Sequence, residues 1–167
     1  MIRGHIPCTW DQQKIKTLDY TPYGYTPGCR VNLTDPADLD RYIVSFSLVR
    51  DLDFDDYPWI NENFTWLKNK HFQINLFKPG EVGPLHTDVY PYYTSLYQCE
   101  DSDLFRVIVF LEDWKNGHYF ELENTGITNY AAGDWVGWDL LNTPHLVANL
   151  GTENRYTLQL TGVRTDV

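Results

Sequence analysis

The sequence predicts a mainly β fold, a jelly roll or closed barrel, on three observations. Aromatic residues make up 16% of the chain, with 6 Trp and 12 Tyr, which suits strands better than a helical bundle. From residue 71 onward, short apolar or alternating segments are separated by turn residues. There are eight such segments, and eight short strands can close a jelly roll or barrel that protects its edges.

The eight predicted strands follow one another with short connections, except before the third. They are residues 71–78, 81–88, 104–114, 118–122, 126–132, 133–140, 145–150 and 155–163. The third (LFRVIVFLEDW) is the most apolar. Pro79 and Gly80 mark a turn between the first two strands, and Asn116-Gly117 is a strong hairpin signal between the third and fourth.

The first 70 residues carry a weaker pattern. Residues 1–40 are rich in Pro, Gly, Tyr and Asp and predict irregular wrapping with at most one short element, whereas residues 41–50 predict a buried strand. Residues 55–69 place apolar side chains at three- and four-residue spacing: Tyr57, Ile60, Phe64 and Leu67. This spacing predicts an amphipathic helix that packs on one face of a sheet. At 167 residues, we expect one domain, with a wrapping segment over residues 1–70 and the strand core over residues 71–163.

Composition narrows the classes of partner. The formal net charge is −10, from 13 Lys and Arg against 23 Asp and Glu, so the surface repels nucleic acid and anionic membranes. The three cysteines (Cys8, Cys29 and Cys99) are isolated, which argues against a disulfide framework and structural zinc. The N-terminus lacks an apolar signal core, and no run approaches membrane-spanning length. We therefore expect a soluble, cytoplasmic protein that has no membrane or nucleic-acid partner.

Two histidines and one aspartate predict a mononuclear iron(II) site. His86 and Asp88 are two residues apart where a predicted strand runs into a loop, so both side chains can point the same way. His145 opens a later predicted strand and completes the set. Two His and one carboxylate leave the opposite face of the ion open for O2 and a co-substrate. Arg155, ten residues further on, could bind a carboxylate with its bidentate guanidinium. Considered one at a time, His86 and Asp88 could instead form a turn, His145 could be a core histidine, and Arg155 could form a surface ion pair.

Placed on the predicted strands, these residues resemble the iron(II)- and 2-oxoglutarate-dependent dioxygenases, over residues 71–163. The resemblance implies a double-stranded β-helix (jelly roll, cupin-like) core with one or two flanking N-terminal helices. In that family the His-x-Asp pair lies at the second core strand, the distal His at the seventh and the oxoglutarate-binding Arg at the start of the eighth. Here those places hold His86, Asp88, His145 and Arg155. The segment 111–122 is similar to a hairpin of the prolyl- and aspartyl-hydroxylase branches.

The resemblance also implies the cofactors and their contacts. Iron(II) is held by His86, Asp88 and His145, and 2-oxoglutarate and O2 are co-substrates, with ascorbate as an optional reductant. Asn75 and the Arg155-x-Thr157 pair are similar to oxoglutarate-binding residues of some members, although Phe77 stands where those members often carry Tyr.

Two further sets of side chains are candidates for the pocket. Arg106 alternates with Ile108 on the third strand, so an inward orientation would bring it to oxoglutarate or substrate; the alternative is an edge salt bridge. Residues 89–103 form a long segment directly after the iron motif, and it carries four tyrosines: Tyr90, Tyr92, Tyr93 and Tyr97. Such a segment is either a substrate-binding loop or a packed surface loop.

The implied activity is hydroxylation of a peptide side chain or an amino-acid-like small molecule, with release of succinate and CO2. An aspartate at position 88 favours hydroxylation, because a Gly or Ala there would open a halide position. Two alternatives stay open: a cupin-like binding module without turnover, and a nucleic-acid dealkylase of the same superfamily. The absence of a basic run weakens the second alternative.

Overall fold

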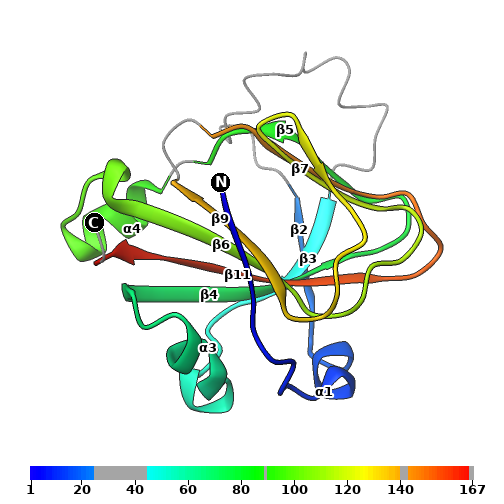
Figure 1. The fold of residues 1–167 in the computed structure, drawn as a ribbon, viewed down its shortest axis with the longest axis horizontal. Helices are drawn as coiled ribbons and strands as arrows, with labels where there is room; N and C mark the ends of the chain where they lie inside the picture. Colours follow the sequence, from blue (N-terminus) through cyan, green and yellow to red (C-terminus); the bar gives the residue numbers. More distant parts are fainter. Residues whose placement is uncertain (25–44, 89, 140–142, 166–167) are drawn as a thin grey trace.

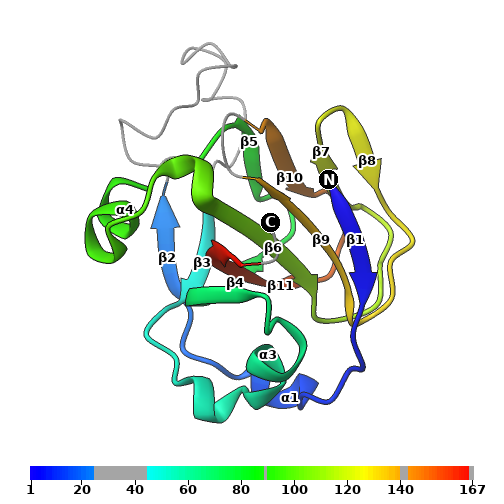
Figure 2. The ribbon, with the colours of Figure 1, turned by 60° about the vertical axis from the view of Figure 1, so that its left-hand side comes forward.

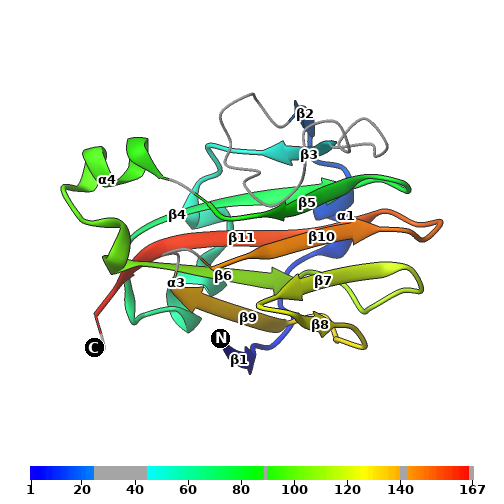
Figure 3. The same cartoon turned by 90° about the horizontal axis from the view of Figure 1, so that it is seen from above.

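A computed structural model describes residues 1–24, 45–88, 90–139 and 143–165 of the chain. In this part, a seven-stranded sheet lies against a four-stranded sheet, and short helices lie at the periphery (Figures 1 and 3). The large sheet has the order β1 (Ile2–His5), β9 (Asp134–Asp139), β6 (Leu104–Phe110), β11 (Arg155–Arg164), β4 (Leu67–Phe77), β3 (Ser45–Val49), β2 (Thr21–Gly24). The small sheet has the order β5 (Val82–His86), β10 (His145–Asn149), β7 (His118–Leu122), β8 (Thr125–Ile127).

The strands β4 to β11 form the jelly roll. Along the chain, β4, β6, β9 and β11 belong to the large sheet, whereas β5, β7, β8 and β10 belong to the small one. All described pairings are antiparallel. The predicted mainly β fold with a double-stranded β-helix core is therefore confirmed, and each of the eight predicted strands overlaps one of these strands.

The hairpin predicted at Asn116-Gly117 is wrong in its pairing. The turn itself is present: Gly117 has a φ of 90°, and the amide of His118 donates to the carbonyl of Lys115 at 2.9 Å. However, β6 pairs with β9 and β11, whereas β7 pairs with β8 and β10. A tight turn fixes the direction of the chain over a few residues, but here the two strands that it joins enter different sheets.

The helix predicted over residues 55–69 is shorter than expected. A 3-10 turn η1 (Phe54–Asp56) precedes α3 (Pro58–Asn63), and the chain is already in β4 at Leu67. Ile60 and Phe64 are buried as the helical spacing predicts, with 0% and 1% exposure. The prediction fails beyond Phe64 because Leu67 pairs with Arg164 of β11, and sheet pairing overrides a local helical pattern.

The N-terminal segment is more regular than predicted. It contains β1, the helix α1 (Gln12–Lys16) and β2, so the expectation of at most one short element is wrong. The side chain of Asp11 caps α1 by accepting hydrogen bonds from the amides of Gln13 and Lys14. The two strands gain their order from pairing with β9 and β3, which local sequence does not reveal. Residues 25–44 of the predicted wrapping and strand lie outside the described residues.

One face of the large sheet packs against helices, and the other lines a cavity. Its outer face packs against α1 and α3, which lie below it in Figure 2, in a core that includes Ile15, Ile60, Ile74, Val107 and Leu158. Strand alternation turns the neighbouring side chains of β4, β6 and β11 to the inner face. These are His71, Gln73, Asn75, Phe77, Arg106, Ile108, Arg155, Thr157, Gln159 and Thr161, and all of them line one cavity. The N-terminal segment therefore covers the outside, and the inner face is left to form a site.

Within the described ranges, no helix is long and apolar enough to cross a membrane. The cytoplasmic location stays a prediction.

Candidate active site

A cavity of about 590 Å³ lies on the inner face of the large sheet. Both sheets and the helix α4 (Pro91–Tyr97) contribute to its lining. Phe120, Trp138 and Val147 supply apolar surface, whereas β4, β6 and β11 supply amides, hydroxyls and two guanidinium groups. The cavity thus combines an apolar wall with a few converging polar groups, as small-molecule sites do.

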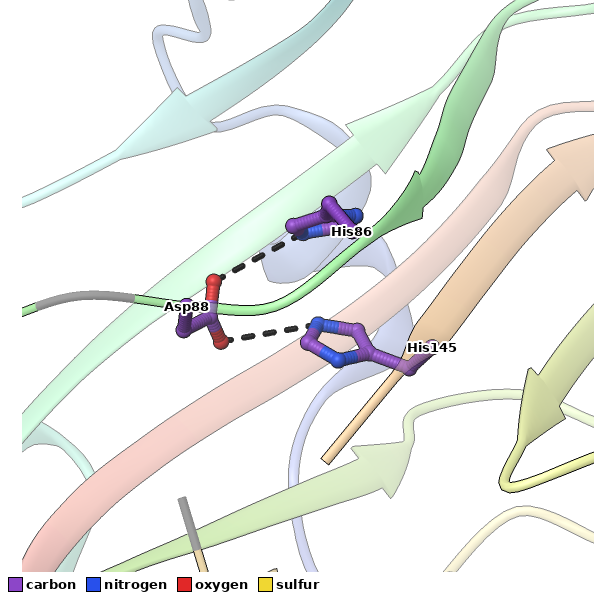
Figure 4. Close-up of side chains that lie close together, drawn as sticks. All are labelled: His86, Asp88 and His145. Carbon is purple, nitrogen blue, oxygen red and sulfur yellow. Dashed lines mark ion pairs between the residues drawn. The ribbon is translucent and has the colours of Figure 1, made fainter. Parts of the chain in front are cut away.

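His86, Asp88 and His145 converge in this cavity (Figure 4). His86 is the last residue of β5 and His145 the first of β10, and the two strands pair with these residues opposite each other. Nε2 of His86 lies 3.6 Å from Oδ1 of Asp88, and Nε2 of His145 lies 3.5 Å from Oδ2. One ligand atom from each residue falls within 4.8 Å of the others. The pairing of β5 with β10 therefore brings together ligands that are far apart in the sequence.

Backbone carbonyls fix which nitrogen of each histidine faces Asp88. Nδ1 of His86 lies 2.6 Å from the carbonyl oxygen of Pro84, and Nδ1 of His145 lies 3.1 Å from that of Thr143. A carbonyl only accepts, so each Nδ1 carries the hydrogen and each Nε2 keeps its lone pair for a metal ion. Burial lowers the pKa of His145 to about 4, against a smaller opposing effect of Asp88. His145 is therefore neutral at pH 7, which is the form that binds metal.

Asp88 is ionised and held through one oxygen. Burial alone would raise the pKa of its carboxyl group, but Arg106, His145 and His86 together hold that pKa well below its usual range. Oδ2 accepts a hydrogen bond from the Tyr90 hydroxyl at 2.9 Å and lies 3.2 Å from Nη2 of Arg106. Oδ1 is left to a metal ion, and a carboxylate that binds metal through one oxygen commonly accepts hydrogen bonds through the other.

The donor set fits a divalent transition-metal ion. Two imidazole nitrogens and one carboxylate oxygen suit iron(II) with open positions opposite the protein. Across the described ranges, this is the one group of three His, Cys, Asp or Glu side chains that converges in this way. The three predicted ligands thus share one place, although their role as ligands stays a prediction.

Arg155 is a buried cation in the same cavity. It is 1% exposed, and its guanidinium carbon lies 5.8 Å from the ring centroids of both Phe77 and Phe110. Nε donates to the Tyr130 hydroxyl at 3.3 Å, whereas Nη2 has no hydrogen-bond partner. Among the described residues, no carboxylate forms an ion pair with Arg155. A buried guanidinium without an anion is costly, so this position suits an anionic ligand.

Asn75 and Thr157 lie near Arg155, and the side-chain amide of Asn75 already has two hydrogen-bond partners. They face each other across β4 and β11, and both line the cavity. Oδ1 of Asn75 accepts from Nε2 of Gln73 at 2.8 Å, and Nδ2 of Asn75 donates to Oε1 of Gln159 at 3.4 Å. A bound oxoglutarate would compete with these amide contacts. The two glutamines were missed, although alternation along the predicted strands places them on the same face as Asn75 and Thr157.

Arg106 faces the cavity and forms its ion pair there, and its contact with oxoglutarate or substrate stays a prediction. The side chain is 1% exposed and lines the cavity. Its partner is Asp88, one of the predicted metal ligands, and its guanidinium carbon lies 4.7 Å from the centroid of the Tyr90 ring. The contacts of Arg106 are therefore with residues at the predicted metal site, not with Arg155.

Within the segment 89–103, the described residues 90–103 are largely helical rather than the long loop expected. It contains α4 and the 3-10 turn η2 (Asp101–Asp103). Tyr90, Tyr93 and Tyr97 line the cavity, and the hydroxyl of Tyr93 donates to the carbonyl of Asn69 in β4. The side chain of Tyr92 lies outside the described part of the structure. Three of the four tyrosines therefore reach the site.

No protein-family model matches the chain, and no curated protein matches it in sequence. Among solved structures, it is similar to a prolyl-4-hydroxylase from Pseudomonas putida, with a TM-score of 0.53 and 17% identity over 92% of this chain and 96% of that one. A cupin domain from Schizosaccharomyces pombe follows, with a TM-score of 0.45 and 6% identity over 71% of this chain and 64% of that one. A cupin protein from Bacteroides fragilis has a TM-score of 0.42 and 12% identity, covering 65% and 76%. At these identities the likeness is one of fold, and the fold of this chain is a jelly roll.

Proposed function

We propose that this chain is an iron(II)- and 2-oxoglutarate-dependent oxygenase that hydroxylates a peptide side chain or an amino-acid-like small molecule. One observation carries the proposal: the convergent His86, Asp88 and His145 share a cavity with the unpaired guanidinium of Arg155. A metal site alone would fit many cupin-type proteins. A metal site together with a buried cation that lacks an anion fits a co-substrate with one chelating end and one free carboxylate.

In the proposed reaction, the metal ligands, Arg155 and the aromatic side chains have separate roles. Bound iron(II) supplies the activation of O2, coupled to conversion of oxoglutarate to succinate and CO2. His86, Asp88 and His145 hold the ion and leave one side of it open. Arg155 pairs with the distal carboxylate, which fixes the orientation of the co-substrate relative to the ion. The aromatic faces of Phe77 and Phe110 exclude water from this pair and so strengthen it.

Substrate would approach from the side of α4. Tyr90, Tyr93 and Tyr97 line the cavity there, and Tyr90 is hydrogen-bonded to Asp88. Their amphipathic rings suit an organic substrate that has both apolar and hydrogen-bonding parts. This arrangement supports a small molecule or a single side chain in the cavity.

Succinate formation tests the proposal. The purified protein is incubated with iron(II), ascorbate and oxoglutarate, and succinate is measured with and without candidate substrates. We expect slow succinate release without substrate, and its loss in His145→Gln and Arg155→Met. Absence of succinate from a protein that also fails to bind iron(II) would refute the proposal.

One observation favours a second candidate, a binding module without turnover. Asp88 already has a cationic partner in Arg106 and a hydrogen-bond donor in Tyr90, so its carboxylate is satisfied without a metal. A binding module would take its ligand equally well in the presence of a chelator, and His145→Ala would leave that affinity unchanged. An oxygenase would lose oxoglutarate affinity in both cases.

A further inference from the structure

The cavity buries two guanidinium groups, and the proposed co-substrate accounts for only one of them. Arg106 and Arg155 are each 1% exposed, and both line the cavity. His71, which also lines the cavity, does not add charge, because burial, together with Arg50 and Arg106, lowers the pKa of its imidazole. Arg50 and Asp51 are exposed, so solvent screens their charges.

In the metal-free site, Asp88 balances the charge of Arg106. Nη2 of Arg106 lies 3.2 Å from Oδ2 of Asp88, in an ion pair between a buried arginine and a partly buried aspartate. Under the proposed function, the two charges of the metal ion are offset by Asp88 and the chelating carboxylate of oxoglutarate. Arg155 is offset by the distal carboxylate. Asp88 then counts against both the metal ion and Arg106, so the loaded site keeps one surplus positive charge, which is costly in a buried position.

Part of the Arg106 guanidinium has no acceptor in this structure. Its Nε atom is buried and has no hydrogen-bond partner among the described residues, whereas Nη2 forms the ion pair with Oδ2 of Asp88. The guanidinium carbon lies 4.7 Å from the centroid of the Tyr90 ring. A second carboxylate could accept from Nε, and such charge-assisted hydrogen bonds are strong. Thr161, the neighbour of Arg106 across the sheet, adds a hydroxyl to the same wall of the cavity.

We propose that the substrate to be oxidised is a carboxylic acid whose carboxylate pairs with Arg106 beside the metal. This inference rests on the proposed function and names its substrate class: an acid such as a free amino acid, rather than a neutral residue inside a peptide. The carboxylate restores charge balance in the loaded site and supplies an acceptor for Nε. It also anchors the substrate within reach of the open side of the ion.

A titration with a minimal acid tests the inference. The full-length protein is loaded with manganese(II) and saturating oxoglutarate, and binding of propionate is followed by ligand-detected NMR. Propionamide, which has the same shape without the charge, is the matched ligand. We expect propionate to bind at least about tenfold more tightly than propionamide, because a charge-assisted pair is lost with the amide. Removal of the metal should weaken propionate binding, because Asp88 then neutralises Arg106.

Two variants test whether Arg106 is the cation that binds propionate. Arg106→Gln should weaken propionate about tenfold while manganese, followed by electron paramagnetic resonance, stays bound. Arg50→Gln removes an exposed cation at the same cavity and should change the affinity by less than about twofold. Equal binding of propionate and propionamide by the unmodified protein would overturn the inference, whatever the variants do. Retention of propionate by Arg106→Gln would overturn it as well.

The same experiment separates the two proposals. Failure to bind manganese and oxoglutarate would remove the proposed function and this inference together. Binding of both without a preference for propionate would remove the inference alone.

Discussion

At the scale of single residues, surroundings rather than residue type give the cavity its chemistry. The guanidinium of Arg155 lies over the rings of Phe77 and Phe110, and its Nε donates to the Tyr130 hydroxyl. Asp88 keeps its negative charge in a partly buried position because Arg106 and two histidines favour it. His145 stays neutral because it is buried. Each of these states is the one that a metal and an anionic co-substrate require.

Replacing Arg155 by methionine should weaken oxoglutarate binding about a hundredfold, because a buried bidentate ion pair is lost. Metal affinity should not change, since Arg155 contacts none of the three ligands. Calorimetric titration of the manganese-loaded protein with oxoglutarate measures the effect. Arg164→Met, on the same strand but outside the cavity lining, is the control and should bind oxoglutarate normally. Equal loss in both variants would assign the effect to β11 rather than to Arg155.

The metal-free protein should lose stability as the pH falls from about 6.5 towards 4. The unfolded chain takes up a proton on His145 below its ordinary pKa of 6.5, whereas the folded chain takes it up only near a pKa of about 4. Unfolding therefore binds a proton in this window and becomes more favourable, by on the order of 3 kcal/mol at its lower end. Urea unfolding with chelator at several pH values measures this loss. His145→Gln should lose less over the same window, and an identical pH dependence would contradict the assignment.

At the scale of elements, the pairing of strands places the site. His86 and His145 meet because β5 lies beside β10, and Arg106 reaches Asp88 because alternation turns it inward from β6. β6 is buried along its whole length, between β11 and β9. Packing at this interface therefore fixes the position of Arg106.

Gly137 in β9 tests that packing. A Cβ atom there would lie 2.5 Å from Cε1 of Phe105 and 3.0 Å from the carbonyl oxygen of Arg106. Gly137→Ala should therefore lower the free energy of unfolding by about 2 kcal/mol, as overpacking of a core does. Gly126→Ala is the control, because its Cβ would meet the movable Tyr119 hydroxyl at 2.9 Å on an exposed part of β8. A chemical denaturation curve for each variant gives the comparison, and similar losses would contradict the argument.

At the scale of the whole molecule, charge separates the surface from the cavity. The chain carries a formal net charge of −10, whereas its cavity buries two arginines. The surface should repel polyanions, and the cavity should accept only small anions that can enter it.

We therefore expect no measurable binding of a single-stranded oligonucleotide, even at low ionic strength where electrostatic attraction is strongest. Fluorescence anisotropy of a labelled oligonucleotide measures this. Oxoglutarate, tested on the same metal-loaded sample, shows that the cavity is functional. Tight oligonucleotide binding that weakens with salt would instead favour a dealkylase that acts on nucleic acid.

Local sequence patterns were enough to predict the strand core and to place the candidate site residues on it. Turn residues and alternation between residues 71 and 163 predicted the eight core strands, because both are local properties of the chain. The spacing of His86 and Asp88 predicted their convergence for the same reason. Arg155 could be placed at the start of a strand, but its lack of a partner could not, since that depends on everything packed around it.

Contacts between distant segments could not be read from local sequence patterns. The turn at Gly117 is local, yet the sheet that each flanking strand joins is set by long-range pairing. Leu67 fits a helix and a strand equally well, and pairing with β11 makes it a strand. The partnership of Arg106 with Asp88, and hence the surplus positive charge of a loaded site, arises where β6 faces the end of β5. The sequence sets the chemical group that each residue carries, whereas burial and strand pairing determine which charged groups lie beside it.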